Sequence, residues 1–238
     1  PERLVGLRPR AYLGMLRDLI AQRSVRRAVL LMGPRRVGKT VLLHHVIQEL
    51  LDSGVPPAEI CYVSVDHPLY NGCSLERFVE LFASATGVDA LKRGYVFFDE
   101  IQYLRDWEVH LKRLVDDHPE LKIVVSGSAA AALRMKSQES GAGRFTDFLL
   151  PPLTFHEYLQ LTGTDGLVEQ TANWVGYGTP SIQQLNNAFV NYLNFGGYPE
   201  VAMSQDIQAD PGRFVKQDII HKVLLRDLPS LYGVQDIQ

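Results

Sequence analysis

The chain has 238 residues, of which 46% are hydrophobic and 21% charged, and its net charge is −3 at pH 7. This is enough apolar material for one large domain or two modest ones, and no run approaches the roughly 18 apolar residues of a membrane span. With no signal sequence, and with only Cys61 and Cys73 to form disulfides or metal sites, we expect a cytoplasmic protein with no membrane partner.

A basic helical segment comes first along the chain. Apolar residues at helical spacing predict a helix over residues 9–24. Residues 1–40 contain ten Lys and Arg against two Asp and Glu, and such a segment can contact nucleic acid phosphates or an acidic partner. We favour the alternative, a solvated helix face together with arginines drawn toward a nucleotide. The arginines concerned are Arg3, Arg8, Arg10, Arg17, Arg23, Arg26 and Arg27.

A strand, a glycine-rich loop and a helix follow. The strand is predicted at residues 27–32 and the helix at 39–52. The loop between them reads GPRRVGKT and matches the phosphate-binding pattern G-x-x-x-x-G-K-[ST]. Its glycines let backbone N–H groups point at a phosphate, Lys39 can reach the β and γ oxygens, and Thr40 can ligate Mg²⁺. The expected nucleotide contacts are Gly33, Pro34, Arg35, Arg36, Val37, Gly38, Lys39, Thr40 and Val41.

Further apolar runs alternate with helical patterns. Strands are predicted at residues 60–65, 95–98, 121–126 and 146–150, with a helix that Ser74 caps and another at 106–118. Strands made of unbroken apolar runs are typical of a parallel sheet that is covered on both faces. We therefore predict an α/β fold, the P-loop NTPase three-layer sandwich with a mainly parallel sheet.

Two adjacent carboxylates end the strand at residues 95–98. Asp99 can contact Mg²⁺ directly or through water, and Glu100 can orient and deprotonate the water that attacks the γ-phosphate. A pair of surface acids that caps the next helix is the alternative, and the phosphate loop favours the catalytic interpretation. A glutamate beside the metal-binding aspartate is typical of water-activating ATPases, and the guanine-specifying motif Asn-Lys-x-Asp is absent from the sequence. We therefore expect ATP and Mg²⁺ as the cofactors.

The strand at 121–126 ends in Ser126, Gly127 and Ser128. In a parallel sheet these small hydroxyl residues lie close to the strand that carries the acids. Ser126 could sense the γ-phosphate or hold the attacking water, and a simple tight turn is the alternative.

After residue 152 the strand signal fades. Helical patterns cover about residues 154–161, 181–194 and 211–227, and the glycine-rich stretch 162–180 suggests a linker or a mobile loop. We expect residues 1–152 to form the nucleotide-binding domain. Residues 153–238 would form a smaller, mostly helical, lid-like region, and the chain could be truncated before a further C-terminal domain.

Several motifs together resemble a known family. They are residues 33–40, Phe98-Asp99-Glu100-Ile101-Gln102, Val125-Ser126-Gly127-Ser128, Gly143-Arg144-Phe145, Pro152-Leu153-Thr154-Phe155-His156-Glu157-Tyr158 and Phe195-Gly196-Gly197-Tyr198-Pro199. This combination is similar to that of prokaryotic AAA-type ATPases, which are related to the AAA+ and STAND groups and usually continue into a C-terminal domain of unknown function. The first two motifs occur in many ATPases, and the later ones are more specific.

The resemblance implies further roles. Arg144 is an arginine-finger candidate, in cis or from a neighbouring subunit of a homo-oligomer, and pairing with a carboxylate is its structural alternative. Pro199 lies in an element similar to the G-x-P motif with which STAND-like proteins contact the adenine region. The helical region has no clear second sensing arginine, which departs from the family pattern.

Two functions follow from these motifs. The first is Mg²⁺-dependent ATP hydrolysis that drives an unknown conformational output. The second is a slow-turnover nucleotide switch or adaptor that controls a protein or DNA partner. A sequence-specific DNA binder has little support, because no reading helix is recognisable and most of the chain is acidic.

Overall fold

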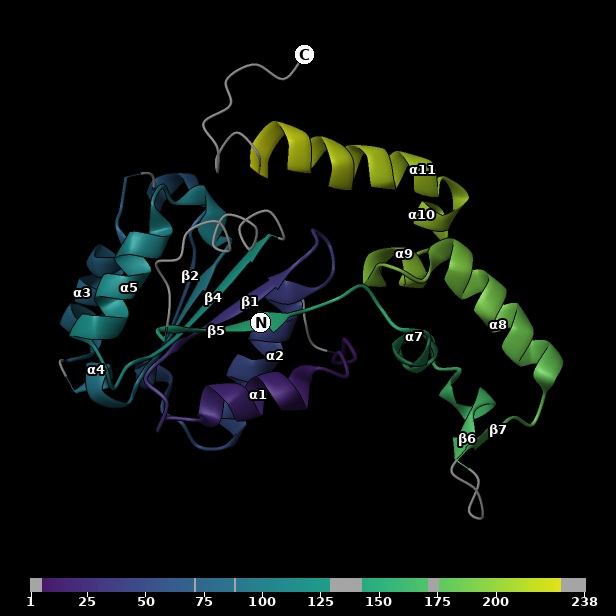
Figure 1. Cartoon of the computed structure of the whole chain (residues 1–238), viewed down its shortest axis with the longest axis horizontal. Helices are drawn as coiled ribbons and strands as arrows, with labels where there is room; N and C mark the ends of the chain where they lie inside the picture. The colour runs from purple at the N-terminus through teal and green to yellow at the C-terminus, as the bar shows by residue number, and fades with distance from the viewer. Residues whose placement is uncertain (1–5, 71, 88, 129–142, 171–175, 228–238) are drawn as a thin grey trace. The chain divides into compact units, whose positions relative to one another are not determined.

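The computed structural model describes residues 6–70, 72–87, 89–128, 143–170 and 176–227 (Figure 1). Contacts divide the chain into two compact units, which are described separately here. The first unit comprises Pro1–Arg35, Lys39–Leu150 and Lys222–Gln238, and the second comprises Arg36–Gly38 and Pro151–His221. The main division falls between Leu150 and Pro151, and the boundary expected from the sequence is after residue 152. Among the described residues, Lys222 to Asp227 group with the first unit.

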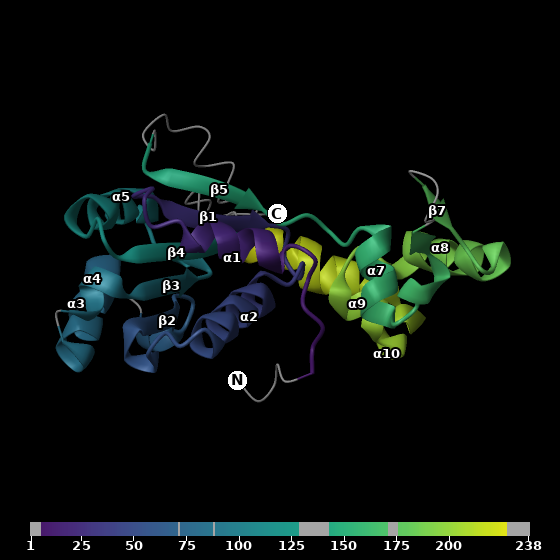
Figure 2. The same ribbon diagram turned by 90° about the horizontal axis from the view of Figure 1, so that it is seen from below.

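The first unit is built on a five-stranded sheet with the order β2-β3-β4-β1-β5 (Figure 2). Every neighbouring pair is parallel, so this sheet is wholly parallel. The strands are β1 (Ala28–Gly33), β2 (Ile60–Ser64), β3 (Tyr95–Asp99), β4 (Lys122–Ser128) and β5 (Phe145–Leu149). The predicted α/β fold class is therefore confirmed.

Helices cover both faces of the sheet. Every residue of the three inner strands β1, β3 and β4 is buried, which explains their unbroken apolar sequence. One face packs against α3 and α5 in a core that includes Leu30, Phe98 and Trp107, and the opposite face is covered by α1 and α2 (Figure 1). The helices of this unit are α1 (Leu13–Ala21), α2 (Lys39–Asp52), α3 (Leu75–Thr86), α4 (Ala90–Arg93) and α5 (Trp107–Asp117).

The second unit is mainly helical. Its core contains Leu153, Tyr158 and Leu159, and the Tyr192 hydroxyl donates to the Leu153 carbonyl over 2.8 Å. Thr154 and Glu157 form a capping box at the start of α7, which explains why this helix begins sharply. The helices are α7 (Phe155–Thr162), α8 (Ile182–Phe195), α9 (Pro199–Met203), α10 (Gln205–Ala209) and α11 (Pro211–Phe214), and π-helical turns follow at Val215–Ile220 and Val223–Asp227.

Three predicted elements differ from the structure. The first helix is α1, shorter than the expected 9–24. The glycine-rich stretch 162–180 is not only a linker, because β6 (Glu169–Gln170) and β7 (Tyr177–Gly178) pair in an antiparallel ribbon. The pattern at 211–227 begins as an α-helix and continues in wider π-type turns, which residue periodicity does not distinguish from an α-helix.

Candidate active site at the carboxyl edge of the sheet

The parallel topology brings the predicted motifs to one edge of the sheet. Strands β1, β4 and β3 end at Gly33, Ser128 and Asp99, and β4 lies between the other two. Because parallel strands all end at the same edge, the phosphate loop, the serine segment and the two acids become neighbours.

The phosphate loop curls over the ammonium group of its own lysine. Lys39 is 6% exposed, and its Nζ donates to the carbonyl oxygens of Gly33 at 3.0 Å and of Pro34 at 2.9 Å. Gly38 has φ +95°, a conformation that glycine adopts without strain. Lys39 also begins the 14-residue helix α2, so the positive end of the helix dipole faces the loop.

The two arginines of the phosphate loop contact side chains outside it. The Arg35 guanidinium donates to the Tyr103 hydroxyl over 2.8 Å. Arg36 adopts a left-handed conformation with φ +63°, which is uncommon for a residue other than glycine. It belongs to the second unit by its contacts and forms an ion pair of 2.7 Å with Glu200. Of the neighbouring loop positions, Val37 is fully buried, while Val41 is half-buried.

Asp99 accepts several hydrogen bonds, which hold its carboxylate in place. It is 1% exposed, and its Oδ2 accepts hydrogen bonds of 2.8 Å from the hydroxyls of Thr40 and Tyr62. Its Oδ1 accepts from the Ser126 hydroxyl and, at 3.1 Å, from the backbone N–H of Glu100. The bond to Thr40 joins the phosphate loop to the end of β3, so the two motifs meet directly.

Glu100 is held in an unusual conformation beside Asp99. Its φ of +58° and ψ of +43° are left-handed, a conformation that non-glycine residues adopt mainly where the surrounding structure imposes it. The Gln102 side-chain amide donates to Glu100 Oε2, and Gln102 Oε1 accepts from the backbone N–H of Ser128 at 3.1 Å. Gln102 is 1% exposed, so one buried amide connects the glutamate to the end of β4.

Ser126 lies where the strand order predicts, although it contacts Asp99 directly. It is fully buried, and its hydroxyl also accepts from the N–H of Glu100 at 3.3 Å. The geometry therefore makes it a support for both acids.

Tyr62 and Gln102 are the residues that sequence reasoning missed. Tyr62 ends up beside Asp99 because β2 pairs with β3, with Ser64 opposite Asp99. Burial, followed by the charge of Asp99, raises the pKa of the Tyr62 hydroxyl, which therefore stays a hydrogen-bond donor. Its ring lies 4.6 Å from that of His44, whose pKa burial lowers. A tyrosine within an apolar run gives no signal of such a role, whereas Gln102 stands two residues after Glu100 in a recognised motif.

The structure does not bring Arg144 to this site. Arg144 immediately precedes β5, and its carbonyl accepts from the N–H of Ala28 at the opposite edge of the sheet. Its guanidinium pairs with Asp116 at 2.8 Å. Arg144 therefore lies at the amino edge of the sheet and forms the carboxylate pair expected of a structural arginine.

Pro199 is the first residue of α9 in the second unit. Gly38, which groups with that unit, lies nearby, because a Cβ added to Gly38 would stand 3.8 Å from Pro199 Cγ.

The oxygen atoms around Thr40 suit a magnesium ion. Mg²⁺ prefers oxygen ligands and usually keeps several waters, with one or two carboxylates and the phosphates of its nucleotide. The Thr40 hydroxyl and the Asp99 carboxylate, which are in contact with each other, supply this chemistry. These residues fit Mg²⁺.

In the described part of the chain, each helix is too short or too polar to cross a lipid bilayer.

The curated relatives have no described activity. The chain is 23% identical over 222 residues to the uncharacterized protein MJ1544 of Methanocaldococcus jannaschii, which covers 93% of this chain and 46% of that protein. It is 30% identical over 146 residues to MJ1637 of the same organism, covering 61% of this chain and 30% of the relative. A Haemophilus influenzae uncharacterized protein is 22% identical, covering 93% and 51%. The chain thus spans about half the length, or less, of these relatives.

Solved structures and a family model agree on the fold. Yeast (S. cerevisiae) Hsp104 in a casein complex matches with a TM-score of 0.55 and 16% identity, over 98% of this chain and 45% of Hsp104. Its ADP complex matches with a TM-score of 0.52 and 14% identity, over 86% and 31%. A family model described as an AAA domain matches residues 25–159, more than half of the chain. The chain therefore belongs to the AAA domain family and has the P-loop fold of AAA-type ATPases.

Proposed function

We propose that this chain binds ATP with Mg²⁺ at the carboxyl edge of its sheet and hydrolyses the bond between the β- and γ-phosphates. The observation that carries the proposal is the hydrogen bond between Thr40 and Asp99, with Glu100 next along the chain. It joins the phosphate loop to a pair of carboxylates that can serve two different purposes. ATP is favoured over GTP because the guanine-specifying motif is absent from the sequence.

Binding of the phosphates falls to the loop. Its backbone N–H groups, the N-terminus of α2 and the Lys39 ammonium all present positive charge to an anion. Lys39 donates to the loop carbonyls of Gly33 and Pro34, so binding of a γ-phosphate would exchange neutral acceptors for charged ones. This exchange favours the charged ligand.

Thr40 and Asp99 would hold the metal ion. When bound, Mg²⁺ neutralises charge on the β- and γ-phosphate oxygens. Tyr62 and Ser126 each donate to one Asp99 oxygen and thereby fix the orientation of that carboxylate.

Glu100 would act as the general base. A water molecule attacks the γ-phosphorus, the bond to the bridging β–γ oxygen breaks, and the proton of the water passes to Glu100, leaving ADP and inorganic phosphate. Gln102 engages Oε2 of the glutamate, and no described residue donates to Oε1. Oε1 is thus the oxygen that can accept the proton, and Gln102 is a positioning residue.

Arg144 would require a second copy of the chain to act on the nucleotide. Its pairing with Asp116 matches the structural alternative, so a role on the nucleotide would have to be exerted across an interface between copies. This remains a proposal for trans action.

A slow nucleotide switch is the second candidate. The Arg36–Gly38 part of the phosphate loop groups with the helical unit, and Arg36 pairs there with Glu200. A nucleotide that moves the loop would alter this ion pair, and a helical unit could report the change to a partner. This candidate predicts very slow turnover and copurified nucleotide.

Replacing Glu100 by Gln tests the hydrolytic proposal. The variant keeps the size of the side chain and loses the base, so kcat should fall by about 10²- to 10⁴-fold while ATP binding stays intact. Lys39→Ala should instead weaken ATP binding.

The matched control is Glu80→Gln on α3, an exposed glutamate that pairs with Arg77 and should leave kcat unchanged. Steady-state phosphate release and nucleotide titration measure both parameters. Wild-type turnover in Glu100→Gln would refute the role of Glu100, whereas tight nucleotide binding with negligible wild-type turnover would favour the switch.

A further inference from the structure

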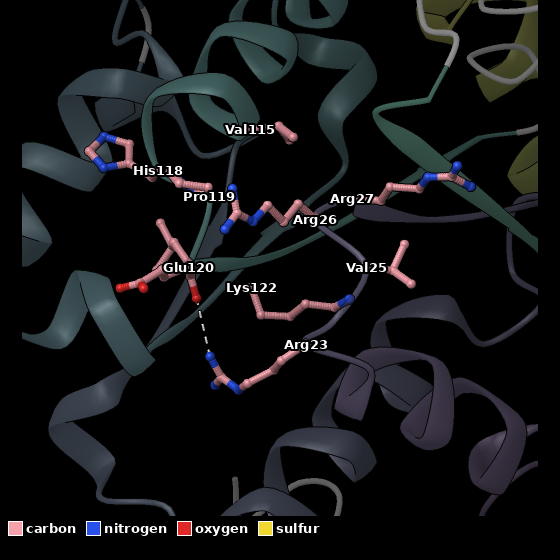
Figure 3. Close-up of a pocket in the computed structure, with 10 residues that line it drawn as sticks. Arg23, Val25, Arg26, Arg27, Val115, His118, Pro119, Glu120 and Lys122 are labelled. Carbon is pink, nitrogen blue, oxygen red and sulfur yellow. Dashed lines mark hydrogen bonds between the residues drawn. The ribbon is translucent and has the colours of Figure 1, made fainter.

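A basic cluster lies at the amino edge of the sheet, opposite the phosphate loop. It contains Arg23, Arg26 and Arg27, which precede β1, and Lys122, which begins β4. All four line one pocket together with His118 and Glu120. In Figure 3, Arg23, Arg26 and Lys122 surround the hollow, while the Glu120 carboxylate and the Arg27 guanidinium point away from it. We call these four cations the basic edge.

Backbone carbonyls hold three of these cations in place, since the Arg27 guanidinium donates to the carbonyl oxygen of Gly143 at 3.0 Å. Arg23 donates to the carbonyl oxygens of Glu120 at 3.2 Å and of Arg93 at 2.5 Å, and its guanidinium lies 4.4 Å from the centre of the Tyr95 ring. Lys122 donates to the carbonyl oxygen of Gln22 at 3.1 Å. The cluster is therefore ordered by neutral partners that leave its positive charge in place.

Carboxylates do not neutralise the basic edge. Lys122 is 5% exposed, and burial together with the charge of Arg23 lowers its pKa. Among the described residues, none of the four cations forms an ion pair with a carboxylate. The acidic residues nearby are otherwise engaged or directed away, since Asp116 pairs with Arg144 and Glu120 turns outward. Lys122 is buried and the three arginines are exposed, so the cluster presents positive charge to solvent, where it attracts anions.

The sequence favoured a solvated helix face, together with arginines drawn toward a nucleotide, as the explanation of the basic segment. Neither explanation accounts for the arginines at 23, 26 and 27. They follow α1, which ends at Ala21, so they are not on a solvated helix face. They stand before β1, whereas the phosphate loop follows it, so they are not drawn toward the nucleotide. The other arginines of the segment differ: Arg17 pairs with Asp18, Arg10 is buried, and Arg3 lies outside the described residues.

The sheet brings these cations to the same end of two neighbouring strands. Lys122 begins β4, and Arg27 directly precedes β1, which pairs with β4 in parallel. Neighbouring strands are about 4.8 Å apart, so the segment before β1 and the start of β4 lie close together.

We propose that the basic edge binds the sugar-phosphate backbone of a nucleic acid without regard to its sequence. A nucleic acid backbone carries one charge per residue at a regular spacing, so several of its phosphates can contact the four cations at once. An isolated acidic side chain would contact only part of the cluster. The site is separate from the nucleotide site, and the inference does not rest on ATP hydrolysis.

Charge reversal at the exposed arginines tests the proposal. The double variant Arg26→Glu/Arg27→Glu changes two residues that are exposed, so the fold should persist. Its control is Arg77→Glu/Arg105→Glu, which reverses two exposed arginines elsewhere and gives the same net charge. Binding is measured by fluorescence anisotropy with a labelled 20-nucleotide single strand and with the matching duplex, from 50 to 200 mM salt.

The expected result is salt-dependent binding by the wild type that falls at least about tenfold in the Arg26→Glu/Arg27→Glu variant, with a shallower dependence on salt. Arg77→Glu/Arg105→Glu and Lys39→Ala should bind as the wild type does, which separates the basic edge from the phosphate loop.

Equal losses in both double variants would overturn the proposal, as would wild-type binding that does not respond to salt. Polyglutamate that displaces the oligonucleotide at equal charge concentration would assign the basic edge to acidic protein segments and also overturn it.

Discussion

Replacing Gln102 by Met removes two hydrogen bonds from the site while keeping the shape of the side chain. The buried N–H of Ser128 loses its acceptor, and Glu100 Oε2 loses its donor. An unsatisfied buried N–H costs about 1–3 kcal/mol, so the free energy of unfolding should fall by that amount. Glu100 would also be free to move, and a misplacement of about 1 Å can cost about 100-fold in rate.

The two effects are measured separately. Urea unfolding gives the stability, and steady-state ATP hydrolysis gives kcat and KM. We expect kcat to fall between about 10- and 100-fold, while KM for ATP changes little because Lys39 and the loop amides are untouched. Gln48→Met on α2 is the control, since Gln48 is exposed and its side-chain amide donates to Asp52 at 2.8 Å. It should change stability by less than about 0.5 kcal/mol and leave kcat unaltered.

A purely structural role for Gln102 makes a different prediction. In that case Gln102→Met would be less stable than the wild type. Without urea, and at a temperature where the variant is fully folded, it would retain the wild-type kcat. That outcome would refute the assignment of Gln102 as a positioning residue for Glu100.

The remaining predictions concern two side chains of β2. Tyr62→Phe removes the hydroxyl that donates to Asp99 over 2.8 Å. Because the acceptor is a carboxylate, the free energy of unfolding measured by urea titration should fall by about 1–3 kcal/mol. A variant as stable as the wild type would show that water replaces the hydroxyl. Burial raises the pKa of the Cys61 thiol to about 11, so in a Cys73→Ser background Cys61 should react with a thiol reagent at pH 8 far more slowly in the native state than in urea. Because the unfolded thiol ionises at lower pH than the folded one, Cys61 should also make the protein less stable as pH rises from about 9 to 11, and equal labelling rates in both states would contradict this.

Local patterns predicted most of the elements because each pattern has a local physical cause. The loop from Gly33 to Thr40 requires glycines and a lysine at fixed positions, and the unbroken apolar runs reflect strands that are buried on both faces. The helical pattern at about residues 154–161 corresponds to α7, and the structure shows that a capping box of Thr154 and Glu157 begins this helix. By contrast, the π-type turns after Phe214 share the apolar pattern of an α-helix and could not be predicted.

The candidate site was predictable only in part. Lys39, Thr40, Asp99 and Glu100 stand in motifs that carry their own chemistry, and Ser126 could be placed near them from the parallel sheet. The support of Asp99 by Tyr62 depends on β2 lying beside β3, and the bond from Gln102 to Ser128 depends on β4 lying on the other side. Arg144 illustrates the opposite case, because its motif suggested the nucleotide site and the register placed it at the far edge.

The sequence by itself determined that a phosphate loop and a pair of acids each end a buried strand, because these features depend on residues that are adjacent in the chain. Only the tertiary structure decided which strands are neighbours, since hydrogen bonds between strands join residues that are far apart in sequence. That decision places Thr40 against Asp99 and ties Glu100 to β4 through Gln102. It also gathers Arg23, Arg26, Arg27 and Lys122 at the opposite edge, where a chain that is acidic overall presents a cluster of positive charge.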